Sequence, residues 1–155
     1  MGSAMIVAGI DPGLGGGVAA VSDDGGCITI LMPVADGIVD TFAVGKFLTD
    51  HFVEFVVIEK THSMPKQGVK STFTFGFVSG QVRGAADALG FPCKLVRPQE
   101  WKKHHDLINK DKNASRDMAT QIFPHAYQQF VRVKDHGRAE AALIAAWHIG
   151  LRGAA

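Results

Sequence analysis

Three carboxylates far apart in the sequence, Asp11, Glu59 and Glu140, are the residues best suited to chemistry. Asp11 and Glu59 each follow an apolar run typical of a buried strand, residues 5–10 and 54–58. Glu140 lies among apolar residues at the start of a helix-like segment. Burying an unpaired carboxylate costs several kcal/mol, so each needs a cation, a metal or a hydrogen-bond donor. Carboxylate oxygens favour Mg²⁺ or Mn²⁺, and we therefore predict one divalent-cation site.

Simpler interpretations exist for each carboxylate taken alone. A single aspartate at a strand end is usually a turn or cap residue. Lys60 could neutralise Glu59, but neighbouring side chains of an extended segment point to opposite faces.

A fourth group precedes Glu140. His136 lies four residues earlier, so both side chains project from one side of the helix start. Asp135 is one residue further and could be either a metal ligand or the helix N-cap. A capping arrangement remains the competing interpretation, and the residues alone leave the choice open.

The turn after Asp11 is rich in glycine, with Gly13, Gly15, Gly16 and Gly17. It lacks the P-loop pattern, and the chain continues as a strand and not as a helix, so neither nucleotide-binding fingerprint applies. We expect no nucleotide cofactor. We interpret the glycines as room for a nucleic-acid backbone or a metal.

The elements that must position these residues follow from hydrophobic patterning. Apolar and β-branched runs predict strands, 3.6-residue spacing predicts helices, and Gly, Pro and Asp mark the turns. The predicted strands are 5–10, 17–22, 26–32, 54–58 and 93–97; the helices are 41–51, 75–89, a short one from Pro98, 113–123 and 137–151; residues 63–70 form a loop. This order predicts an α/β fold with a mixed five-stranded sheet, three antiparallel strands then two parallel ones, and helices on both faces. Sites in such sheets lie at the carboxyl ends of parallel strands, where Asp11 and Glu59 are.

Composition limits the class of protein. With 155 residues, 46% hydrophobic and 20% charged, the chain fits one soluble globular domain. No apolar run is long enough to cross a bilayer, so we expect no membrane partner. Residues 1–4 are interpreted as a cloning remnant and residues 5–152 as the domain. Cys27 and Cys93 lack ligand spacing and are interpreted as reduced core thiols of a cytosolic protein.

Basic residues are clustered although the net charge is only +1. Six of them fall between residues 97 and 116, and a second group surrounds Asp135. Local clusters of this kind favour a polyanion as partner, although a solvated charged face is the plainer interpretation.

Three segments together resemble a known family. Residues 6–13 (IVAGIDPG), 56–60 (VVIEK) and 135–145 (DHGRAEAALIA) resemble the signature segments of RuvC-type Holliday junction resolvases, in the same order and at suitable spacings. The last segment is most similar to phage members and to the chloroplast resolvases of plants.

The resemblance implies a ribonuclease-H-like nuclease domain acting as a homodimer. Such an enzyme would resolve four-way DNA junctions by paired symmetric nicks, using two Mg²⁺ or Mn²⁺ ions per site. Asp11, Glu59 and Glu140 match the metal-binding acids. His136 matches the fourth ligand best, with Asp135 as the alternative because the two late ligands lie four residues apart and not three. Lys112 matches a basic residue that meets the scissile phosphate.

The resemblance also suggests where DNA and the second subunit would bind. Residues 75–89 match the dimer helix, and His62 and Met64 lie where the family wedges into the junction centre. The candidate DNA-binding residues are Lys66, Lys70, Arg83, Lys102, Lys103, Lys110, Lys112, Arg132 and Arg138. The expected location is the cytoplasm, at the nucleoid or in a phage-infected cell, or else an organelle.

Three other functions have some support in the sequence. Another ribonuclease-H-like nuclease, acting on RNA–DNA hybrids or other branched DNA, is the main one. An ATPase or sugar-kinase half would need two lobes, which 155 residues cannot supply. A non-catalytic junction-binding protein would be expected to lack one of the acids.

Overall fold

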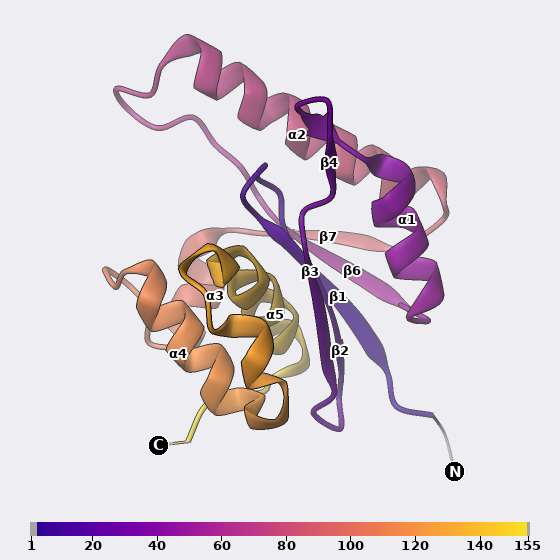
Figure 1. Ribbon diagram of the computed structural model, residues 1–155, viewed down its shortest axis with the longest axis vertical. Coiled ribbons are helices and arrows are strands. Elements are labelled where there is room, and N and C mark those ends of the chain that lie inside the picture. The colour runs from indigo at the N-terminus through magenta and orange to yellow at the C-terminus, as the bar shows by residue number, and fades with distance from the viewer. Residues whose placement is uncertain (1–2, 155) are drawn as a thin grey trace.

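The computed structural model describes residues 3–154, so segment 1–4 lies partly outside the described residues. Its centre is a five-stranded sheet in the order β3-β2-β1-β6-β7 (Figure 1). The strands are β1 (Ile6–Asp11), β2 (Gly17–Ser22), β3 (Cys27–Leu31), β6 (Phe55–Glu59) and β7 (Cys93–Val96). β1, β2 and β3 pair antiparallel, while β6 and β7 run parallel to β1. The expected mixed sheet is confirmed.

The sheet separates two hydrophobic cores because successive strand residues face opposite sides. Val7 and Val57 belong to the core on one face, together with the inner residues of the last helix. Ala8, Ile10 and Ile58 belong to the core on the other face. Burial on both faces explains why these strands are continuous apolar runs.

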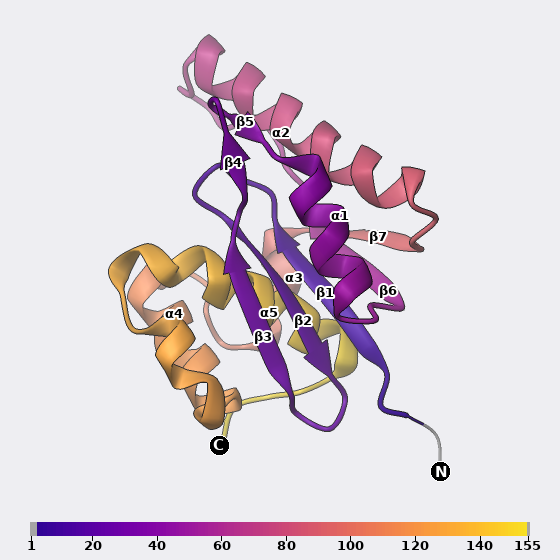
Figure 2. The same ribbon diagram turned by 45° about the vertical axis from the view of Figure 1, so that its right-hand side comes forward.

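Helices cover both faces, as Figures 1 and 2 show. α1 (Thr41–Asp50) and α2 (Val69–Ala88) pack on one side. α5 (His136–Ile149) lies against β1 and β2 on the other side, with α4 (Lys112–Ile122) outside it. α3 (Pro98–His104) follows β7 and contacts α5. Asp40 caps α1 and Asp111 caps α4, each accepting a backbone N–H bond three residues on.

The structure corrects the sequence prediction in three places. α2 begins at Val69 and not at residue 75, so part of the expected loop 63–70 is helical; its buried residues start only at Val78, and its first turns extend beyond the sheet. A short hairpin, β4 (Val34–Ala35) and β5 (Ile38–Val39), was not expected. Two 3₁₀ segments, Pro124–Phe130 and Val133–Asp135, precede α5.

The thiols of Cys27 and Cys93 are free, and both residues are partly buried. Within residues 3–154, no helix combines the length and the apolar character needed to cross a membrane.

Candidate metal centre

Strand geometry brings Asp11 and Glu59 to one edge and one face of the sheet. Ile10 is in register with Ile58 in the parallel pair β1–β6, so Asp11 and Glu59 leave the sheet as neighbours. Alternation along β1 and β6 turns both side chains towards α5, on the side of Val7 and Val57. The other face, where Ile10 and Ile58 point, is closed by α1 and α2.

The start of α5 reaches this edge because glycines let two backbones touch. A Cβ on Gly9 would lie 2.0 Å from the carbonyl oxygen of Ala141, and one on Gly17 would lie 2.7 Å from that of Gly137. A Cβ on Gly137 would in turn collide with the backbone of Gly16. The glycine-rich turn therefore serves mainly to seat α5 on β1 and β2. Within the turn, only Gly15 has an open Cβ position, and a Cβ on Gly13 would make ordinary contacts with the backbone of Gly15 and Gly16. The expectation that all these glycines make room for DNA or metal is corrected.

Seating α5 this closely places His136 and Glu140 beside Asp11. One ligand atom from each of the three residues lies within 4.8 Å of the other two. Asp11 is only 9% exposed. Burial raises the pKa of Asp11 well above its ordinary value, and the nearby carboxylates of Glu140 and Glu59 raise it further. Burial, together with the positive charge of Lys112, lowers the pKa of His136.

Glu59 borders this cluster but is held by a different partner. Its Oε2 accepts a 2.7 Å hydrogen bond from the indole Nε1 of Trp101. Burial raises the pKa of Glu59, the Trp101 bond counteracts that rise, and Glu140 adds to it. The three-residue cluster does not include Glu59, which lies at its margin with one oxygen already bonded.

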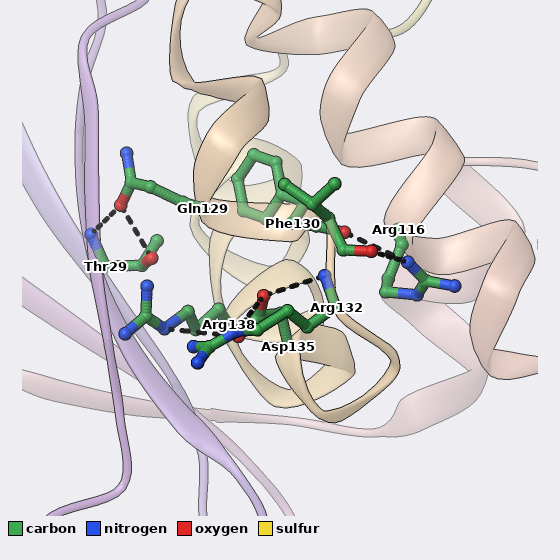
Figure 3. Close-up of polar contacts among 8 residues, drawn as sticks. Thr29, Arg116, Gln129, Phe130, Arg132, Asp135 and Arg138 are labelled. Carbon is green, nitrogen blue, oxygen red and sulfur yellow. Dashed lines mark hydrogen bonds and ion pairs between the residues drawn. The ribbon is translucent and has the colours of Figure 1, made fainter.

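Asp135 has a structural role, as Figure 3 shows. Its side chain is 1% exposed and accepts hydrogen bonds from the guanidinium and backbone N–H of Arg132. Arg138 lies 3.8 Å from the same carboxylate. Burial alone would raise the pKa of Asp135, but the bonds from Arg132 outweigh it and lower the pKa. With its oxygens engaged by arginines, Asp135 lies outside the cluster that contains His136.

The predicted basic residues fall into three groups. Lys112 and Lys102 lie close enough to the acids to lower the pKa of Asp11 and of Glu59, respectively. Three arginines are paired with acids: Arg83 with Asp87, and Arg132 and Arg138 with Asp135. The exposed remainder is Lys66, Lys70, Lys103 and Lys110. The wedge candidates His62 and Met64 are exposed on the loop between β6 and α2.

Sequence reasoning missed Trp101. The residue is fully buried on α3, next to Lys102. A signal was present, because a tryptophan within a charged segment (QEWKKHHD) must bury its ring and find an acceptor for its N–H. Nothing in the sequence named Glu59 as that acceptor.

Comparison with known proteins gives one sequence relative and several structural ones. No protein-family model matches the chain. The chain is 32% identical over 94 residues to the chloroplastic Holliday junction resolvase MOC1 of Chlamydomonas reinhardtii, covering 60% of this chain and 11% of that protein. Thermus thermophilus RuvC in complex with a Holliday junction substrate matches with a TM-score of 0.66 and 20% identity, over 93% of this chain and 92% of the other. A second Thermus thermophilus RuvC structure matches with a TM-score of 0.64 and 21% identity, over 93% of each chain.

Proposed function

The fold is that of RuvC, a ribonuclease-H-like fold, and from the acids on it we propose that residues 5–152 form a structure-selective DNA endonuclease. Its proposed reaction is the resolution of four-way junctions by paired symmetric nicks. The observation that carries this proposal is the convergence of Asp11, His136 and Glu140, with Glu59 at their margin, at the carboxyl end of β1 and β6. The chain spans only about a tenth of the curated relative (11%), so the activity in that protein's name is support by analogy.

The residues fit a divalent cation. Two carboxylates and an imidazole share one small volume, and Asp11 is buried beside like charges that raise its pKa. The Nδ1 atom of His136 is buried and has no hydrogen-bond partner within residues 3–154. A bound cation would offset the repulsion between the buried carboxylates and would give the His136 imidazole a partner. Hard oxygen ligands select Mg²⁺ or Mn²⁺.

We propose that Asp11, Glu59, His136 and Glu140 hold two such ions, which would activate water and stabilise the leaving oxygen of a phosphodiester. The chain's own residues orient the substrate. The proposed contact to the scissile phosphate is Lys112, exposed at the first turn of α4; its effect on the pKa values of Asp11 and His136 supports this role. The proposed DNA contacts are Lys66, Lys70, Lys102, Lys103 and Lys110.

A homodimer is part of the proposal because paired nicks need two active sites. α2 exposes stacked Phe73 and Phe77, whose ring centroids lie 6.3 Å apart. Beside them Gly76, Gly80 and Gly84 form a row four residues apart with open space at each Cβ position. Small residues permit close helix approach, and exposed aromatic rings supply apolar area.

His62 and Met64 are the proposed wedge, on the loop that leads into α2. The proposed setting is a compartment with recombining DNA, either a bacterial cytoplasm, including a phage-infected cell, or an organelle.

The direct test is cleavage of a synthetic four-way junction in Mg²⁺ or Mn²⁺, beside duplex, splayed-arm and RNA–DNA hybrid controls. Paired symmetric nicks in the junction alone are expected. Asp11→Asn should abolish nicking while leaving junction binding in Ca²⁺ intact. Preferential cutting of the RNA strand in the hybrid would instead identify another ribonuclease-H-like nuclease.

The dimer has its own test. Phe77→Ser should weaken self-association in analytical ultracentrifugation and convert paired nicks into single nicks. The control is Phe42→Ser, which changes an even more exposed phenylalanine on α1. A wild-type protein that stays monomeric with and without junction DNA would contradict the dimer.

A further inference from the structure

We propose that Trp101 is a positioning residue for Glu59: its indole N–H holds one carboxylate oxygen, so that the other is directed at the cluster formed by Asp11, His136 and Glu140. The inference rests on the proposed metal-dependent function, and it adds a residue outside the four candidate ligands.

The bond itself has the geometry of a strong interaction. Trp101 Nε1 lies 2.7 Å from Glu59 Oε2, and Trp101 is fully buried. An indole has a single N–H donor and no acceptor, so it can bond only one oxygen of the carboxylate. A charge-assisted bond of this length restricts rotation of the carboxylate, which otherwise turns freely at its last torsion.

The indole cannot follow the carboxylate if Glu59 moves, because α3 is anchored at two levels. The ring packs in the core that contains Val57, Val96 and Leu143. One turn later, buried His105 forms a 2.9 Å bond through Nε2 to the carbonyl oxygen of Leu143 on α5. α5 is the helix that carries Glu140. The α3 segment therefore links β6, which carries Glu59, to α5.

Trp101 also places a positive charge. Lys102 Nζ lies 5.5 Å from the centroid of the Trp101 ring, within the range of a cation–π contact. This contact keeps the ammonium group near Glu59, whose negative charge it stabilises. Loss of the indole would thus remove a donor and release a cation from the same carboxylate.

The informative substitution is Trp101→Phe, which keeps an aromatic ring in the core and removes the N–H. Outer hydrogen bonds to metal ligands typically contribute 10–100-fold to metal affinity. We expect Trp101→Phe to bind Mn²⁺ about tenfold more weakly in calorimetry. The matched control is Trp147→Phe, because Trp147 is the other tryptophan and its ring faces Lys94.

Cleavage measured against Mn²⁺ concentration separates positioning from folding. For Trp101→Phe, the Mn²⁺ concentration for half-maximal rate should rise about tenfold, while the rate at saturating Mn²⁺ stays near that of the wild type. Junction binding in Ca²⁺ should not change. A purely structural role would instead lower the thermal midpoint and the amount of active protein without moving the Mn²⁺ dependence.

A luminescence measurement tests the geometry without any cleavage and without removing Trp101. In Trp147→Phe, Trp101 is the only indole, and Tb³⁺ bound beside Glu59 should emit strongly when tryptophan is excited. Mg²⁺ should quench that emission by displacement. Trp101→Phe retains Trp147, two turns and about 10 Å along α5 from Glu140, and should emit far more weakly.

The outcomes distinguish this inference from the proposed function. If Trp101→Phe binds Mn²⁺ as tightly as the wild type while Glu59→Gln binds it weakly, Trp101 only fills the core and the inference is overturned. If Asp11→Asn and Glu59→Gln also leave Mn²⁺ affinity unchanged, the metal centre itself is wrong. If Trp101→Phe fails to fold, the Tb³⁺ emission of the double variant Trp147→Phe, Glu59→Gln is compared with that of Trp147→Phe. An equally strong emission from the double variant overturns the inference.

Discussion

The buried imidazole of His105 should make this protein lose stability as the pH falls from 7 towards 4. His105 is 2% exposed, and its Nε2 lies 2.9 Å from the carbonyl oxygen of Leu143, which can only accept a bond. The proton therefore sits on Nε2. The other nitrogen, Nδ1, is buried without a partner in residues 3–154. Burial accordingly lowers the pKa of His105 from 6.5 to about 4.

The sign follows from proton uptake. Between pH 6.5 and about 4 the unfolded chain holds a proton on this imidazole that the folded protein does not hold. Stability is therefore complete above pH 6.5 and declines as the pH falls through this window. A pKa lowered from 6.5 to about 4 corresponds to about 3 kcal/mol in the free energy of unfolding, of which about 2 kcal/mol is lost by pH 5.

The assay is urea unfolding at several pH values from 7.5 to 4.5, comparing the wild type with His105→Gln. Other groups also have shifted pKa values: the raised pKa of Asp11 acts in the opposite direction, while the lowered pKa values of His136 and His148 act in the same direction. The difference between the two proteins cancels these contributions. It should be largest at pH 7 and shrink by about 2 kcal/mol at pH 5.

A control substitution of the same kind is His125→Gln, at an exposed position. Its difference from the wild type should stay small at every pH. A His105→Gln difference that is also independent of pH would refute the claim that His105 is held neutral in the core.

Three further results are expected. Asp11→Asn should raise the stability of the metal-free protein by about 1 kcal/mol in urea unfolding, because it removes a buried charge beside other carboxylates, while it abolishes cleavage. Asp135→Asn should cost about 2 kcal/mol by weakening its bonds to Arg132 yet leave Mn²⁺ affinity in calorimetry unchanged, whereas His136→Ala should lose that affinity; the reverse pattern would make Asp135 the ligand. Gly9→Ala should cost about 3 kcal/mol or more, because its Cβ would lie 2.0 Å from a backbone oxygen of α5; an unchanged urea midpoint would contradict this packing.

Most of the fold could be predicted from the sequence because the hydrophobic pattern of the strands matches their positions in the sheet. Runs buried on both faces predicted β1 and β6, and strands 17–22 and 26–32, separated by Asp and Gly residues, correspond to the β2–β3 hairpin. The early start of α2 was missed because its first turns carry Thr and Phe side chains with little to bury them. The β4–β5 hairpin was missed although its turn is Asp36-Gly37, a residue pair typical of hairpin turns in which both central residues have positive φ. Both residues have positive φ here.

The sequence by itself determined which acids could share a site. Alternation along two parallel strands is a local property, and it was enough to turn Asp11 and Glu59 to the same edge. It could not choose between His136 and Asp135, because adjacent helical residues differ in direction by about 100° and only the packing of α5 says which one faces the sheet.

That packing depends on contacts between distant backbones. Gly9, Gly17 and Gly137 let α5 lie against β1 and β2, which brings His136 and Glu140 to Asp11 and leaves Asp135 to its arginines. The bond from Trp101 to Glu59 joins residues 42 positions apart and likewise exists only once α3 has docked. Sequence spacing identified the candidate acids, and tertiary packing decided which neighbouring side chains lie beside them.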